Sequence, residues 1–476
     1  MMPSFPSIIV ERDTIRAEGA FAVSQAAYLD PDPALVAELD ARLVEERTGV
    51  VAHYYMDPEL QGALAACPRA AVHIADSLAM AEQAVEMARR GARRVLVLGV
   101  DFMAENARAT LDAAGFEHVP VYRVVAGEVG CSLAAAADAP AYLAWLQRAA
   151  RQPRSVHVVY VNTSLTAKAR AEALLPTIAC TSSNVVRTLL SLYAELPGVH
   201  VWFGPDSYMG RNLEALLRRQ AAMGDETVRG LHAGLDAAAL RDACDRFHAY
   251  PSGTCIVHEQ FGASIVERVR RELPDADVAA HLEVPGEMFD LALERASEGR
   301  GVVGSTSNIL EFIVRRAQQR PDGTVRVVLG TETGMVGSIV RGVRRALAPG
   351  GRVEIVFPVA AEAIRATQDP ELPVVPGGGG EGCTVAGGCA TCPYMKMSSL
   401  DALMDVVRRL GRVDEATLAP LAPRRPDTMV AGRPAYELGR APIAAMRELG
   451  RTGRLPEALR RRVLGEPSTA PTDATA

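Results

Sequence analysis

Val156-His-Val-Val-Tyr-Val161 is an apolar run that leads directly into the polar residues Asn162-Thr-Ser164. An alanine-rich stretch with helical character, residues 168–175, follows it. A short apolar run of this kind is typical of a buried parallel strand, and the next stretch predicts a helix that returns along the sheet. This strand-and-helix unit therefore indicates an α/β fold.

The same alternation recurs along the chain. Further buried strands are predicted at 94–100, 199–203, 254–257, 277–283, 301–304, 325–329 and 353–357. Helical stretches separate them, such as 79–92, 209–223 and 308–319. We therefore expect small parallel sheets flanked by helices, preceded by a strand and a helix within an N-terminal extension, residues 1–45.

Size and composition narrow the function classes. The chain has 476 residues, 49% of them hydrophobic and 23% charged, which predicts about three globular domains. A net charge of −6 argues against a nucleic-acid-binding protein, because such proteins usually carry an excess of basic residues. No uncharged apolar stretch reaches the length of about 18 residues that a membrane span needs. Because the first residues lack the pattern of a signal peptide, we expect a cytoplasmic protein.

Polar motifs follow six of the predicted strands. They are Tyr160-Val-Asn-Thr-Ser164, Phe203-Gly-Pro-Asp206, His258-Glu259, His281-Leu-Glu283, Gly304-Ser-Thr-Ser307 and Gly330-Thr-Glu332. Open α/β sheets bind their ligands at the carboxyl ends of the strands. Six such ends predict one shared central site.

The cysteines indicate a metal cluster. Cys389-Ala-Thr-Cys392 is followed by a proline, as in many iron–sulfur proteins. Cys131, Cys255 and Cys392 are separated by intervals of roughly 120 to 140 residues, each about one small domain long. Three thiolates on a four-iron cluster would leave one iron without a protein ligand, and such an iron is a Lewis acid.

Other interpretations of the cysteines stay open. A single cysteine is more often a buried apolar thiol, and Cys67, Cys180 and Cys244 are assigned to that class. The Cys389 and Cys392 pair could hold zinc, although the chain has no second Cys-x-x-Cys. Cys383 and Cys389 are either spare thiols or partners in a disulfide.

Several polar groups have both a catalytic and a structural interpretation. His53-Tyr54-Tyr55 is either aromatic core or a group that binds a carboxylate and exchanges its protons. Asp76-Ser77, Thr181-Ser-Ser-Asn184 and Ser305-Thr-Ser307 are either helix caps or anion sites at helix starts. Glu283, two residues after His281 on the same strand face, is a candidate general base.

Lysine is rare in this chain. Only Lys168 and Lys396 occur among 51 basic residues, and both fall inside motif segments. The other basic residues are all arginines. A lysine in such a chain indicates a position that requires a compact ammonium group instead of a planar guanidinium.

Nine of these segments, in order from about residue 50 to residue 400, resemble the quinolinate synthase (NadA) family. They are His53-Tyr-Tyr, Asp76-Ser-Leu, Gly130-Cys-Ser-Leu, Tyr160-Val-Asn-Thr-Ser with Lys168, Cys180-Thr-Ser-Ser-Asn, Gly253-Thr-Cys-Ile-Val-His-Glu, Gly304-Ser-Thr-Ser, Gly330-Thr-Glu and Cys392-Pro-Tyr-Met-Lys-Met. The resemblance implies three similar α/β units around a pseudo-threefold axis. It also implies a central [4Fe–4S] cluster held by Cys131, Cys255 and Cys392.

We expect the units to follow one another along the chain. The predicted boundaries are 46–134, 135–256 and 257–392, with C-terminal helices at 393–476 that return to the first unit and end in a disordered tail. The family condenses iminoaspartate with dihydroxyacetone phosphate to quinolinate, phosphate and water, in NAD biosynthesis. An L-aspartate oxidase is a possible partner that would supply the unstable imine.

The resemblance also implies roles for single residues. It implies that the carboxylates or phosphate of the substrates are bound by His53, Ser77, Asn162, Ser182, Ser305 and Thr306. It also implies that proton transfer and orientation of the substrate are carried out by Tyr55, Tyr160, His258, His281 and Glu283.

The chain departs from the family pattern at Met56, Leu282 and Val284. These departures keep two alternatives open: a paralogue with the same cluster and another substrate, and a non-catalytic iron–sulfur sensor. Retention of the acid–base residues favours an enzyme.

Overall fold

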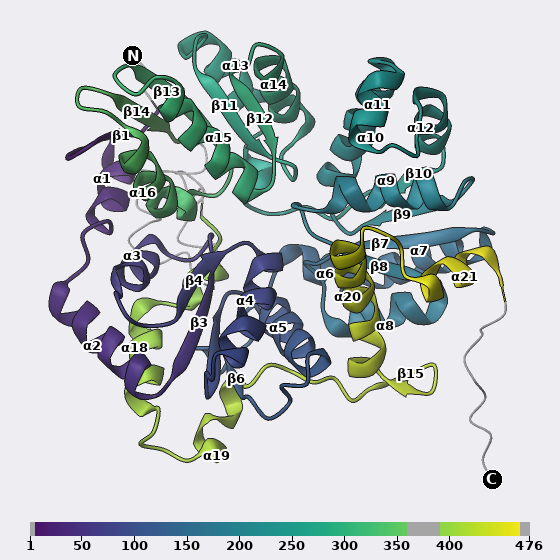
Figure 1. The fold of residues 1–476 in the computed structure, drawn as a ribbon, viewed down its shortest axis with the longest axis horizontal. Coiled ribbons are helices and arrows are strands. Elements are labelled where there is room, and N and C mark those ends of the chain that lie inside the picture. The colour runs from purple at the N-terminus through teal and green to yellow at the C-terminus, as the bar shows by residue number, and fades with distance from the viewer. Residues whose placement is uncertain (1–4, 359–390, 467–476) are drawn as a thin grey trace, which may run out of the picture. The chain divides into compact units, whose positions relative to one another are not determined.

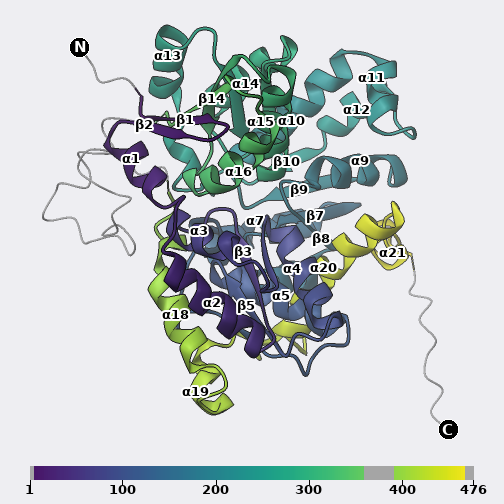
Figure 2. The same ribbon diagram turned by 60° about the vertical axis from the view of Figure 1, so that its left-hand side comes forward.

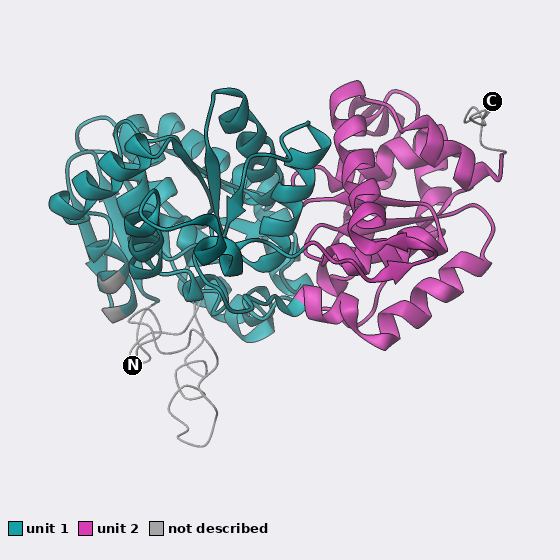
Figure 3. Ribbon diagram, turned by 90° about the horizontal axis from the view of Figure 1, so that it is seen from below, with its two compact units in different colours: residues 1–132, 254–424 teal, residues 133–253, 425–476 magenta. Residues whose placement is uncertain are grey.

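The computed structural model describes residues 5–358 and 391–466. Three sheets, each built around parallel strands, are flanked by helices (Figure 1). The chain divides into two compact units (Figure 3), unit 1 with residues 1–132 and 254–424 and unit 2 with residues 133–253 and 425–476. The α/β prediction is confirmed, whereas the three successive domain boundaries stay a prediction.

The first sheet of unit 1 is wholly parallel, in the order β4-β3-β5-β6. Its strands are β3 (Thr48–His53), β4 (Val72–Ala75), β5 (Arg94–Leu98) and β6 (Val121–Tyr122), and its helices include α3 (Pro58–Ala66), α4 (Ser77–Arg89) and α5 (Asp101–Ala113). β3 is buried along its whole length, as expected for a central parallel strand. His53 is the last residue of β3 and therefore lies at the carboxyl end of the sheet.

The second sheet of unit 1 has the order β12-β11-β13-β14-β1-β2. Four strands are parallel: β11 (Asp277–His281), β12 (Gly301–Gly304), β13 (Thr324–Gly330) and β14 (Arg352–Val356). The N-terminal hairpin of β1 (Ser7–Glu11) and β2 (Ile15–Glu18) joins the sheet antiparallel beside β14 (Figure 2). Its helices include α13 (Ala263–Glu272), α14 (Gly286–Ser297), α15 (Thr306–Gln319) and α16 (Val336–Ala346).

Unit 2 contains one parallel sheet in the order β10-β9-β7-β8. Its strands are β7 (Ser155–Tyr160), β8 (Thr177–Cys180), β9 (His200–Gly204) and β10 (Phe247–Ala249). The helices around it include α7 (Pro140–Arg151), α8 (Leu165–Leu174), α9 (Val185–Glu195), α10 (Ser207–Ala222) and α12 (Ala237–Cys244). An aromatic cluster of Tyr142, Trp145, Trp202 and Tyr250 fills the core on one side.

The C-terminal segments pack in both units. In unit 1, α18 (Leu400–Arg409) lies against α2 (Pro33–Glu45) and α3. In unit 2, α20 (Ala435–Thr452) packs on α8 and β8. The approach is close enough to require Gly439, since a Cβ there would lie 2.3 Å from the carbonyl oxygen of Leu165. The last helix, α21 (Glu457–Leu464), follows α20.

Two strand predictions need correction. Residues 254–257 form a loop that enters the short 3₁₀ helix His258–Gln260, because the carbonyl of Cys255 accepts the amide of Glu259 (3.0 Å) instead of pairing in a sheet. β11 ends at His281, so Glu283 lies in the turn after the strand and not on the strand face. No helix within the described ranges has the length and apolar character to cross a bilayer.

Candidate active site

The three predicted cluster cysteines all lie in unit 1. Cys131 and Cys255 are on loops that Ser132 joins, because its hydroxyl donates to the carbonyl of Thr254 (2.9 Å) and accepts the amide of Ile256 (3.4 Å). These bonds connect segments that are more than 120 residues apart in the sequence. Ser132 therefore brings the Cys131 and Cys255 loops together.

Gly130 brings the third cysteine segment to the same place. A Cβ at Gly130 would lie 3.2 Å from Cε1 of Tyr394, so the absence of a side chain lets the Tyr394 ring pack on this loop. The Cys392 amide donates to Oε1 of Glu332 (2.9 Å), which lies after β13. The Cys392 segment is therefore held by contacts on both sides. Cys383 and Cys389 lie outside the described residues.

The thiols influence one another electrostatically. Burial raises the pKa of the Cys255 thiol well above its usual value, and Glu283, Cys392 and Cys131 raise it further. Burial, Glu332 and Cys131 raise the pKa of Cys392 to about 12. Thiolates in such a place require a positive charge beside them, which a metal centre supplies. The donor set thus fits a [4Fe–4S] cluster with three cysteine ligands.

Acid–base groups lie beside the Cys255 thiol. The Cys255 sulfur and ligand atoms of His258 and Glu283 all lie within 4.8 Å of one another. Oε2 of Glu283 lies 3.0 Å from Nδ1 of His258, although Nδ1 is off the line of a hydrogen bond. Oε1 of Glu283 lies 3.8 Å from Nδ1 of His281. The carboxylate therefore lies beside the Nδ1 atoms of two imidazoles, whose rings stack on each other with centroids 4.8 Å apart.

Thr331 links the first and second sheets of unit 1 at this point. Its hydroxyl lies 2.9 Å from the phenol oxygen of Tyr55 and 3.1 Å from Nε2 of His258. Thr331 is completely buried and directly follows β13. The result is a hydrogen-bonded path from Tyr55 through Thr331 to His258, and the Glu283 carboxylate lies beside the other ring nitrogen of His258.

Two histidines of the site are neutral. Burial lowers the pKa of His53 to about 4 and that of His281 to about 3. Nδ1 of His53 accepts the Tyr55 amide (3.2 Å), and Nδ1 of His281 accepts the Glu283 amide (3.3 Å). The proton of each neutral ring is therefore on Nε2, which makes both rings hydrogen-bond donors. Burial also raises the pKa of Tyr55 well above its usual value, so Tyr55 keeps its proton.

Gln61 fixes the loop that carries Tyr55. Its Nε2, which has two hydrogens to donate, lies within hydrogen-bonding distance of the carbonyl oxygens of Tyr54 (2.8 Å), Met56 (2.7 Å) and Gly334 (2.7 Å). These bonds hold the end of β3 against the turn after β13. Met56 itself is completely buried in the core.

The other departures from the family pattern, Leu282 and Val284, are likewise at most 2% exposed. Met56, Leu282 and Val284 are therefore as deeply buried as the neighbouring Glu283.

The polar motifs at the helix starts of unit 1 differ in what their side chains do: some cap the helix, and one hydroxyl has no partner among the described residues. Asp76 caps α4 by accepting the amides of Leu78 and Ala79, and Ser77 is the first residue of that helix. Ser305 and Asn308 form a reciprocal cap at the start of α15. In contrast, the Thr306 hydroxyl is buried and has no hydrogen-bond partner among the described residues. A donor in this state at a helix start is suited to an anion.

The remaining predicted residues belong to unit 2. Tyr160 ends β7 and pairs with Cys180 at the end of β8, so both strands finish at the same edge. Asn162 and Ser182 lie in the turns after these strands and are partly exposed. The fold thus brings Asn162 and Ser182 to neighbouring strand ends within unit 2.

Three residues of the site carry functions that sequence reasoning missed. Thr331, Glu332 and Gln61 join segments that are far apart in the chain. The motif Gly330-Thr-Glu332 at a strand end was the available signal for two of them. Gln61 lies inside α3 and gave no comparable signal.

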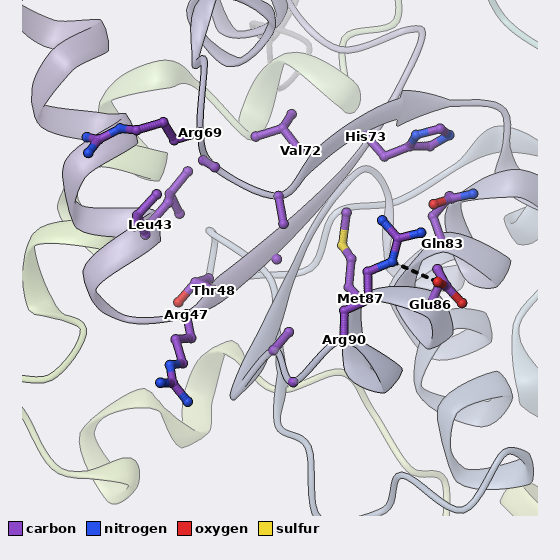
Figure 4. A pocket seen from close by; sticks show the side chains of 16 residues that line it. Leu43, Arg47, Thr48, Arg69, Val72, His73, Gln83, Glu86, Met87 and Arg90 are labelled. Carbon is purple, nitrogen blue, oxygen red and sulfur yellow. Dashed lines mark hydrogen bonds and ion pairs between the residues drawn. The ribbon is translucent and has the colours of Figure 1, made fainter.

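Unit 1 also has a hollow of about 540 Å³ at the amino ends of β3 and β4, the opposite sheet edge from His53. Arg69 and Arg90 at its rim pair with Asp40 and Glu86. Figure 4 shows the side chains of Arg47 and Arg69 directed away from each other. These arginines therefore do not converge on one ligand.

Comparisons with known proteins agree with this geometry. The family described as quinolinate synthetase A protein (NadA) matches residues 37–420. The chain belongs to the quinolinate synthase family. A chloroplastic quinolinate synthase of Arabidopsis thaliana is 47% identical over 97% of this chain and 67% of its own length.

Another chloroplastic quinolinate synthase, from Oryza sativa subsp. japonica, is 44% identical over 98% of the chain and 70% of its own length. A third, from Nicotiana tabacum, is 45% identical over 98% and 68%. These relationships, which extend over nearly the whole of this chain, confirm the predicted quinolinate synthase activity and its place in NAD biosynthesis.

The prediction of a cytoplasmic protein is wrong by the same comparisons, since these quinolinate synthases are chloroplastic. That prediction used only the composition of the first residues, which carries little information about the compartment. The comparisons also give no support for an L-aspartate oxidase partner.

Proposed function

We propose that this quinolinate synthase condenses iminoaspartate with dihydroxyacetone phosphate, and that unit 1 carries the acid–base chemistry. The observation that carries the proposal is the path from Tyr55 through Thr331 to His258, next to Glu283 and the Cys255 thiol. Loss of phosphate and of two waters requires groups that both give and take protons. The path supplies such groups within hydrogen-bonding distance.

Cys131, Cys255 and Cys392 would hold a [4Fe–4S] cluster, which supplies a Lewis-acidic iron when bound. Glu283 lies close enough to the Cys255 thiol to act on substrate atoms beside it. A carboxylate beside two imidazoles can accept a proton from carbon, while the hydrogen-bonded path of His258, Thr331 and Tyr55 next to it relays protons to and from Tyr55. We assign Glu283 as general base and Tyr55 as the proton donor for a departing hydroxyl.

The acid groups of the substrates require donors. In unit 1, Nε2–H of His53, the Ser77 hydroxyl and the unpartnered Thr306 hydroxyl meet this need, with Ser305 holding the start of α15. In unit 2, we assign carboxylate or phosphate binding to Asn162 and Ser182, and orientation to Tyr160.

The relationship to quinolinate synthases over nearly the whole of this chain favours the family reaction over a paralogue with another substrate. The retained acid–base groups likewise favour an enzyme over a sensor.

Glu283→Gln tests the proposal in anaerobically reconstituted protein. Turnover should fall by about 10²-fold or more, because the amide cannot accept the proton, while iron content stays at the wild-type level. Glu287→Gln, an exposed substitution in the first turn of α14, is the matched control. Wild-type turnover by Glu283→Gln would show that the Glu283 carboxylate is not the general base.

A further inference from the structure

Lys168 lies near the start of α8 and is completely buried. It is one of two lysines in a chain with 51 basic residues. Removing an ammonium group from water is costly unless hydrogen bonds replace its hydration. A lysine at this position therefore requires specific local partners.

Those partners are the carbonyl groups on either side of Asn162. Nζ of Lys168 donates to the carbonyl oxygen of Val161 (3.1 Å) and to that of Thr163 (2.5 Å). The amide of Thr163 donates to the same Val161 carbonyl (2.7 Å), and its hydroxyl donates to the Tyr160 carbonyl (3.1 Å). The turn that carries Asn162 is thus closed around the ammonium group.

The ammonium also lies near the neighbouring strand end. The amide of Val161 donates to the carbonyl of Cys180 (2.8 Å), the last residue of β8. The charge on Lys168 acts on the buried Cys180 thiol and opposes the rise in its pKa. A fixed positive charge is therefore present beneath the turns that carry Asn162 and Ser182.

Helix α20 packs closely on this arrangement. At Gly439 it approaches the carbonyl of Leu165, the first residue of α8, so closely that no side chain fits between them. An ammonium offers three donors from one atom, which suits two carbonyls at a shared point. The guanidinium of arginine distributes its donors over a planar fork and does not offer the same single-atom geometry.

We propose that Lys168 is a positioning residue, which fixes the Asn162 turn through the Val161 and Thr163 carbonyls and supplies positive potential for a substrate acid group bound there. This inference rests on the proposed role of Asn162 in substrate binding. It assigns to Lys168 no contact with substrate. The side chain acts through the backbone of the turn and through its charge.

Lys168→Met tests the proposal, since methionine keeps much of the side-chain length and removes the charge and the donors. Steady-state turnover is measured anaerobically for cluster-reconstituted Lys168→Met, Asn162→Ala and the double variant. We expect Lys168→Met to raise KM, by roughly tenfold, for the same substrate whose KM Asn162→Ala raises, with iron content unchanged. In the double variant, the positioning effect of Lys168 has no Asn162 side chain to act on, so the rise in KM should be smaller than the product of the two single rises.

Glu172→Gln is the control for a purely structural effect. Glu172 lies one turn further along α8 and accepts from Arg462 and from the Thr177 amide. This substitution should lower the melting temperature and leave both KM values unchanged. If Lys168→Met behaves like Glu172→Gln, the positioning role is wrong.

Other outcomes separate the two proposals. If Asn162→Ala changes no kinetic parameter, the proposed role of Asn162 fails, whatever Lys168→Met does. If Asn162→Ala raises KM and Lys168→Met does not, the inference about Lys168 fails alone. Lys168→Arg keeps the charge and should fold with a raised KM. Failure of both Lys168 variants to fold would contradict the proposal, because the ammonium would then serve the fold as a whole.

Discussion

Oε2 of Glu283 lies 3.0 Å from Nδ1 of His258, and both side chains are buried beside the Cys255 thiol. Glu283 comes from the turn after β11, whereas His258 begins a 3₁₀ helix on a different segment. The pair therefore exists only in the folded chain. It places an acid–base couple next to the atoms expected to hold the cluster.

Thr331→Val should interrupt the path between Tyr55 and His258 while keeping the side-chain shape. We expect kcat to fall by about 10- to 100-fold, and the free energy of unfolding to fall by about 1–3 kcal/mol, because two polar partners lose their hydrogen bond. Anaerobic kinetics and denaturant unfolding measure the two effects. Thr110→Val is the control, since the buried Thr110 hydroxyl has no partner among the described residues. Equal kcat values for the two variants would contradict the relay.

Cys392→Ser should remove one of the three thiolates and cause loss of most of the bound iron. Iron and sulfide are measured per chain after anaerobic reconstitution. Cys67→Ser changes a half-buried thiol whose pKa burial raises to about 11, and it should keep the full complement. Wild-type iron content in Cys392→Ser would show that this thiol is not a ligand.

Gly130→Ala should displace the Tyr394 ring, since the new Cβ would lie 3.2 Å from Cε1. The neighbouring Cys392 segment then shifts, and we expect a lower iron content and faster loss of iron in air. Gly127→Ala is a matched control three residues away, where the nearest atom to a new Cβ is 3.9 Å distant. Identical iron retention in both variants would argue that Tyr394 does not support the cysteine segment.

His157 in unit 2 should make the core sensitive to acid. Its Nδ1–H donates to the Trp202 carbonyl (2.7 Å), its Nε2 accepts from Tyr142 (3.1 Å), and burial lowers its pKa to about 4. Between pH of about 6.5 and 4 the unfolded chain binds the extra proton, so the free energy of unfolding falls as pH falls. The loss from this group approaches about 3 kcal/mol at the acid end.

Fluorescence of Trp145 and Trp202, the two tryptophans of the chain, follows this transition in the core around His157. His157→Gln removes the titrating group, so its unfolding free energy should vary less over the same pH window. The exposed His118→Gln should keep the wild-type pH dependence. A His157→Gln curve as steep as that of the wild type would assign the acid sensitivity elsewhere.

Much of the fold was predictable because parallel strands and their helices leave local patterns. The apolar runs at 156–161 and 325–329 correspond to β7 and β13, since buried strands in α/β proteins are continuously apolar. The run at 254–257 has the same local character and forms a loop instead. Its backbone groups bond to Ser132 and Glu259, and no local pattern encodes such partners.

The sequence by itself determined the family, the α/β class and the chemical types of the candidate site residues, because motifs and periodicities are local properties of a chain. Only the tertiary structure decided that Thr331 meets Tyr55, 276 residues away, and that Lys168 is buried beneath Asn162. A hydrogen bond depends on distance and direction in space. Those quantities exist only after the sheets have packed and buried the groups concerned.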